Sequence, residues 1–77
     1  MFKVIELNKI EKIIQEQNYN LDVFKDFIFK NVKSRMSFSL MFIEIDLLLE
    51  ACEIEEITNI LKNLKSKFGD MFILDLK

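Results

Sequence analysis

The chain has 77 residues, of which 51% are hydrophobic and 31% charged, and it contains no proline, no histidine and one cysteine. This length allows a single small domain, residues 1–77, and the apolar content predicts an ordered globular chain. The net charge of −2 argues against a general nucleic-acid binder, and the absence of histidine removes the commonest zinc ligand and general base.

Cysteine use and hydropathy point to a protein of the cytoplasm. Cys52 has no partner for an internal disulfide, which favours a reducing compartment. The most apolar stretch, Phe38 to Ala51, contains three acidic residues and is too short to cross a bilayer. We therefore expect a cytoplasmic protein without a membrane span.

Two interpretations of the first 18 residues stay open. In one, Phe2–Leu7 is a short strand, and Asn8 caps a following helix with Glu11 as its capping-box partner. In the other, a single helix runs from Lys3 through Gln17. The apolar spacing is compatible with both.

A second helix is predicted to begin at Asn20 or Asp22 and to run to about Arg35. Its apolar residues recur at spacings of three and four, which is typical of a helix that packs one face on a core. This face comprises Leu21, Phe24, Ile28 and Val32, with Phe27 beside it.

The segment Ser37–Asp46 reads as an apolar strand that ends in two carboxylates. Apolar residues occupy both of its faces, which is typical of a central strand covered on each side. Because strand side chains alternate, we expect Glu44 and Asp46 to share one face at the strand's end.

A third amphipathic helix follows, from about Ile54 to Phe68, with acidic residues at its start and lysines at its end, as the helix dipole favours. Gly69 is placed to close it, and Met71–Leu76 alternates like a strand. The sequence therefore predicts a small α/β domain with a mainly antiparallel sheet of two to four strands and about three packed helices.

Residues 19–76 resemble a GGDEF domain, the fold of diguanylate cyclases. The sequence YNLDVF (19–24) is similar to that family's helix start, FSLMFIEID (38–46) to its first strand, and FGDMF (68–72) to its signature turn. Residues 1–18 would be an additional strand or helix. The fold that the resemblance implies is a reduced, palm-like α/β domain.

The resemblance also implies a site. In the family, the first acid of the strand end and an acid of the signature hairpin hold Mg²⁺; these positions correspond to Glu44 and Asp70, with the hairpin at Gly69. However, the signature has lost one glycine and its glutamate, and Leu47–Leu49 stand where a guanine-reading segment is expected. Two-metal phosphoryl transfer needs several carboxylates and a phosphate cradle. We therefore predict no enzyme and no cofactor.

The leading functional hypothesis is a non-enzymatic protein–protein interaction module that binds a protein partner or forms a homo-oligomer. The second helix has more aromatic side chains than one small sheet can cover, so Phe27 and Phe29 are the predicted interaction surface. A role in bacterial signalling or motility follows from the resemblance alone.

Two other functions are alternatives to the interaction module. A nucleotide-binding protein would use Glu44, Asp46 and Asp70 with Mg²⁺, although acids at a strand end most often reach solvent without a ligand. Nucleic-acid binding through Lys25, Lys30, Lys33 and Arg35 is the least supported, because no interleaved basic and aromatic motif accompanies these residues.

Overall fold

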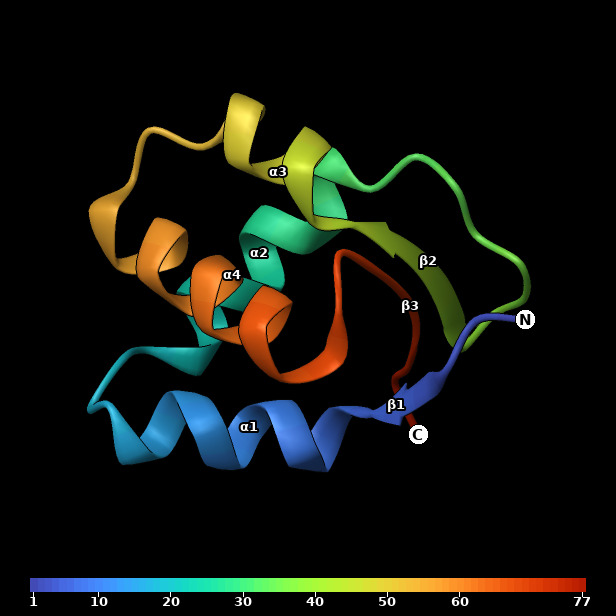
Figure 1. Cartoon of the computed structure of the whole chain (residues 1–77), viewed down its shortest axis with the longest axis horizontal. Coiled ribbons are helices and arrows are strands. Elements are labelled where there is room, and N and C mark those ends of the chain that lie inside the picture. The colour runs from blue at the N-terminus through green and yellow to red at the C-terminus, as the bar shows by residue number, and fades with distance from the viewer.

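In the computed structural model, which describes residues 1–77, four helices pack on one face of a three-stranded sheet (Figure 1). The elements in chain order are β1 (Val4–Glu6), α1 (Leu7–Glu16), α2 (Leu21–Asn31), β2 (Leu40–Glu44), α3 (Ile45–Ala51), α4 (Glu55–Phe68) and β3 (Met71–Asp75). The predicted small α/β fold is confirmed, with one helix more than expected.

The sheet has the strand order β1-β3-β2, so the last strand of the chain lies at its centre. β1 runs parallel to β3 and β2 runs antiparallel to it, so the sheet is mixed. The prediction that Ser37–Asp46 forms the central strand is wrong: β2 is shorter and lies at an edge. Asp46 belongs to the first turn of α3, so it does not share a strand face with Glu44.

Burial along the strands shows that only one face of the sheet is covered. In β2, Met41 and Ile43 are buried, whereas Leu40 and Phe42 are partly exposed. β3 repeats the pattern, with Phe72 and Leu74 buried, Met71 exposed and Ile73 partly exposed. The prediction that both faces of β2 are covered fails because all the helices pack on the same side of the sheet.

The first segment is a strand followed by a helix, which decides between the two interpretations left open. α1 begins at Leu7 with Glu6 as its N-cap residue, and no side chain caps it. Asn8, the predicted cap, therefore lies inside the helix. The helix ends at Glu16, and Asn18 adopts a positive φ of 57° in the turn to α2.

α2 is capped as predicted but is shorter than predicted. The Asn20 side chain accepts hydrogen bonds from the backbone N–H groups of Asp22 (2.9 Å) and Val23 (3.4 Å). The helix ends at Asn31, because the following residues leave it to pair with the outer edge of β2. There, Phe42 N–H donates to the Ser34 carbonyl (3.4 Å) and Met36 N–H donates to the Leu40 carbonyl (3.2 Å).

α3 was not expected, although its apolar residues follow helical spacing at Ile45, Leu48 and Leu49. α4 matches the predicted third helix closely. Its first turn contains Glu55 and Glu56, and Gly69 closes it at φ 93°. The Gly69 N–H donates to the Lys65 carbonyl at 3.0 Å.

The helices and the covered face of the sheet share one core of nineteen buried residues, all hydrophobic. Phe24 of α2 and Phe72 of β3 are its largest fully buried side chains. None of the helices is both long and apolar enough to cross a membrane.

Candidate interaction surface

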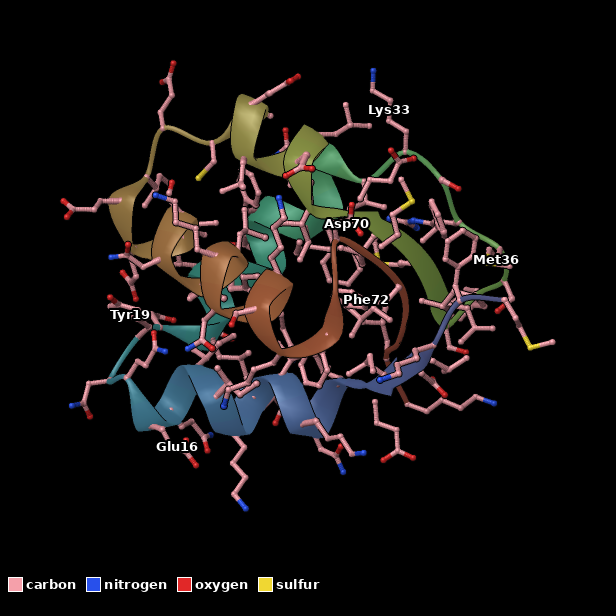
Figure 2. All side chains as sticks on the ribbon, in the orientation of Figure 1. Glu16, Tyr19, Lys33, Met36, Asp70 and Phe72 are labelled. Carbon is pink, nitrogen blue, oxygen red and sulfur yellow. The ribbon has the colours of Figure 1, made fainter.

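The predicted metal residues lie at one end of the sheet. Glu44 is the cross-strand partner of Met71, and Ile45 N–H donates to the carbonyl of Asp70 at 2.9 Å. The backbones of Glu44 and Asp70 are therefore neighbours, as the sequence suggested, and Figure 2 labels Asp70 beside the upper end of the sheet.

Asp46 is held by a lysine of α4. The Lys65 Nζ donates to the Asp46 Oδ1 at 2.8 Å, and both side chains are largely solvent-exposed. This hydrogen bond, together with the charge of Asp46, raises the pKa of Lys65 above its usual value, and the charge of Asp70 adds to the effect. The ammonium group of Lys65 therefore lies near the carboxylates of Asp46 and Asp70.

No three acidic or cysteine side chains come close enough together to hold a metal ion. The Mg²⁺ site at Glu44 and Asp70 stays a prediction. The expected hairpin at Gly69 is wrong, because α4 precedes this glycine and β3 follows it. Gly69 and Asp70 connect a helix to a strand, so they do not form the turn between two strands that the signature hairpin requires.

The two predicted interaction aromatics have different environments. Phe27 is only 9% exposed and belongs to the core, so its assignment to a surface is wrong. It lies about one helical turn after the core residue Phe24 and directly before the core residue Ile28, and this places it on the covered side of α2. Phe29 is 44% exposed, and the guanidinium of Arg35 lies 5.7 Å from its ring centre.

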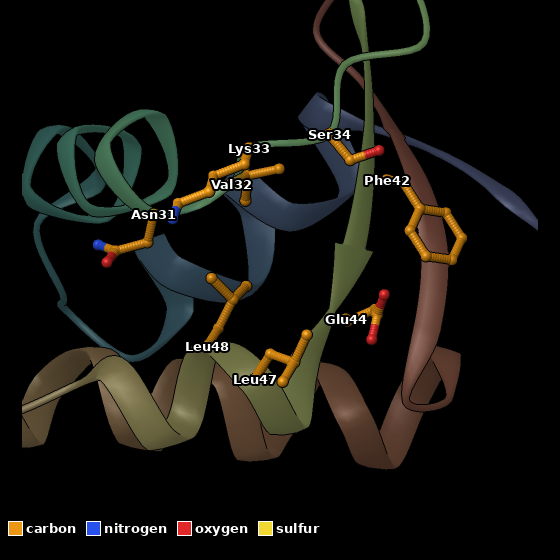
Figure 3. Close-up of a pocket in the computed structure, with 8 residues that line it drawn as sticks. All are labelled: Asn31, Val32, Lys33, Ser34, Phe42, Glu44, Leu47 and Leu48. Carbon is orange, nitrogen blue, oxygen red and sulfur yellow. The ribbon is translucent and has the colours of Figure 1, made fainter.

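Two shallow grooves border the edge strand β2. One, of about 310 Å³, opens below the segment that pairs with β2 and lies between the end of α2 and the start of α3 (Figure 3). Its wall mixes apolar side chains with single charges, Lys33 and Glu44. The other, of about 350 Å³, contains Phe29, Arg35 and Phe38. Neither encloses a buried polar group that would select a ligand.

The uncovered face of the sheet, which we call the open face, is rich in apolar side chains outside the core. It comprises the alternate strand residues Val4 and Glu6 of β1, Leu40, Phe42 and Glu44 of β2, and Met71, Ile73 and Asp75 of β3. Five of these eight positions are apolar, three are acidic and none is basic.

The apolar residues of the open face form a continuous row across all three strands. Ile73 is the direct cross-strand neighbour of both Val4 and Phe42. The ring of Phe2, which precedes β1, packs edge-to-face on Phe42 with ring centres 4.8 Å apart. Val4 and Phe2 remain 55% and 48% exposed, whereas Phe42 and Ile73 are half-buried, so the row is partly open to solvent.

The acidic residues lie on both sides of this row, toward the two ends of the strands. Glu6 and Asp75 are cross-strand partners at one end, and Glu44 lies beside Met71 at the other. The chain has a single salt bridge, Lys65–Asp46, so none of the three open-face carboxylates is paired with a cation. The open face thus has an apolar row across its strands, with negative charge on each side of the row.

The sequence pattern of the strands does not decide which of their two faces is the uncovered one. Alternation in β1 and β3 separates two sets of residues, but both sets contain apolar side chains. Only the position of the helices decides which set is buried. Comparison of the chain with known protein families, with characterised proteins and with solved structures finds no match.

Proposed function

We propose that this protein is a non-enzymatic interaction module that binds another protein chain through the open face of its sheet. The observation that carries the proposal is the apolar row of Phe2, Val4, Phe42 and Ile73, in which Phe2 and Val4 are exposed and Phe42 and Ile73 are partly exposed. A sheet with an apolar face normally buries it against a second layer, and a contiguous exposed apolar surface typically marks a binding site.

The proposal moves the interaction surface away from Phe27 and Phe29. Phe27 is fully engaged in the core, and Phe29 is shielded in part by Arg35. The bound chain is either a second copy of this protein or a different protein. A relationship to GGDEF domains, with a role in bacterial signalling or motility, stays a proposal that rests on the motif order in residues 19–76.

Site-specific photo-crosslinking tests the proposal. A photoreactive phenylalanine analogue replaces Val4 or Met71 on the open face, and replaces Ile54 in a control protein. Ile54 is 47% exposed and lies in the connection between α3 and α4, at the opposite end of the molecule from the sheet (Figure 1).

Irradiation in the cells that make the protein should give a discrete adduct from positions 4 and 71 and none from position 54. Sedimentation of the purified protein over a range of concentrations then shows whether the adduct is a second copy. Adducts from all three positions alike, or from none of them, would contradict the proposal.

A further inference from the structure

The charges of the open face restrict which chain can cover it. Along β3, Met71 is level with Glu44 and Asp75 is level with Glu6, and the apolar row lies between these two levels. Four residues of an antiparallel strand span about 13 Å. Measured along the strands, the carboxylate of Glu44 is therefore separated from those of Glu6 and Asp75 by about this length.

A second copy is a poor occupant of this face. If two open faces meet with their strands parallel, Asp75 of one copy lies opposite Asp75 of the other, at the end of the face that also carries Glu6. If the strands are antiparallel, Glu44 of one copy lies at the end of the face that carries Glu6 and Asp75 of the other. Either arrangement brings carboxylates together, and like charges placed opposite one another are destabilising.

An extended segment is also a poor occupant. The backbone groups of the strands point along the sheet, so a chain that lies on its face finds only side chains there. A buried backbone needs hydrogen-bond partners, and a helix supplies its own. A helix on this face would complete a helix–sheet–helix arrangement of three layers, which is common in α/β proteins.

We infer that the open face binds an amphipathic helix of a different chain, with an apolar stripe and a Lys or Arg at each end of it. This inference rests on the proposed function and narrows its partner. Since a helix rises 1.5 Å per residue, the two cationic ends are about nine residues apart. The cations pair with Glu44 at one end and with Glu6 and Asp75 at the other.

The test uses synthetic peptides and the full chain. The basic peptide is a capped, Ala- and Gln-based 15-residue helix with leucines on one face and lysines nine residues apart. A matched peptide has glutamates in place of the lysines, and a third has the leucines scrambled. Calorimetry measures affinity, and amide chemical shifts report where the peptide binds.

The basic peptide should bind at least tenfold more tightly than the glutamate peptide, with shifts on β1, β2 and β3, and the scrambled peptide should not bind. The triple variant Glu6→Gln, Glu44→Gln, Asp75→Asn should remove the preference for lysine while leaving weaker binding. Val4→Lys should weaken binding of the basic peptide at least tenfold. Ile54→Lys, the matched control, should leave binding unchanged. The amide spectrum of each variant verifies that it is folded.

Equal affinity of the basic and glutamate peptides, or no binding of either, would overturn the inference. The crosslinking result then separates the two ideas. Adducts at positions 4 and 71 without peptide binding leave the proposed function standing and remove the helical, cationic partner. No adducts and no peptide binding remove both.

Discussion

Gly69 occupies a backbone conformation that side-chain-bearing residues avoid. Its φ of 93° and ψ of 177° lie outside the left-handed helical region, in an area used almost only by glycine. A Cβ built there would meet no atom within 4 Å. Any effect of a substitution therefore comes from the backbone and not from crowding.

Gly69→Ala should lower the free energy of unfolding by about 1–3 kcal/mol. Gly69→Asn is the informative companion, because asparagine tolerates the left-handed helical region but not this one. Both variants should lose similar stability in urea unfolding. If Gly69→Asn is as stable as the parent protein, the conformation assigned to this residue is wrong.

The surroundings of Lys65 raise its pKa. Its hydrogen bond to Asp46 favours the charged form, so its pKa should lie above 10.5. A raised pKa of a lysine stabilises the folded state below the unfolded pKa, and this contribution is lost as the pH rises through the folded value. The stabilisation is thus present at neutral pH and is lost only under alkaline conditions.

Asp46→Asn should move the pKa of Lys65 back toward its usual value. Titration of the lysine side-chain carbons by NMR measures this directly. Glu50→Gln, on the last turn of α3, is the control and should leave the Lys65 titration in place. An unchanged pKa in Asp46→Asn would mean that the salt bridge does not form in solution.

Among the elements, those with clear chemical boundaries are the ones that the sequence predicted well. α4 has acids at its start, lysines at its end and a terminal glycine, and all three signals agree. α2 begins at its predicted cap, Asn20. Its end was placed too late because the apolar spacing continues to Val32, whereas pairing with β2 withdraws the next residues from the helix.

The edge position of β2 could not have been predicted from its own residues. Phe42 and Ile43 are similar in hydrophobicity, yet one faces the open side and the other the core. A strand that is apolar on both faces has the same pattern whether a second layer covers it or not. The open face was not predicted for the same reason, because the sequence pattern does not show which face of the sheet the helices leave uncovered.

A pair of asparagines tests the boundaries of the helices. Asn20→Ala removes the side-chain cap of α2 and should lower stability by about 0.5–2 kcal/mol. Asn8→Ala lies inside α1, where alanine is the better helix former, and should leave stability unchanged or slightly increased. Thermal unfolding of both variants distinguishes the structure from the first of the two sequence-based interpretations, under which Asn8 is a cap and its loss is destabilising.

The whole molecule is a two-layer structure with one core, and this sidedness has an energetic consequence. A chain of this length is stabilised by only about 4–12 kcal/mol in total. Neighbouring residues of β1 contribute very differently, because Ile5 is 6% exposed and Val4 is 55% exposed. Substitutions at Ile5 and Val4 of β1 therefore test the covered face and the open face of the sheet separately.

Ile5→Ala should lower the free energy of unfolding by about 2–5 kcal/mol through the cavity it leaves. Val4→Ala should change it by no more than about 0.5 kcal/mol, since the site is at the surface. Urea unfolding of the two variants measures the difference. Equal losses would mean that the sheet is covered on both faces.

The central position of β3 also constrains how the chain acquires its structure. β1 and β2 each pair with β3 and not with each other, and β3 is the last element of the sequence. During synthesis, therefore, β1 and β2 have no β3 to pair with while α3 and α4 are being made. The contact between Val4 and Ile73 joins opposite ends of the chain, and such distant pairings slow folding. Until Met71–Asp75 leaves the ribosome, the nascent protein can form helices but has no sheet.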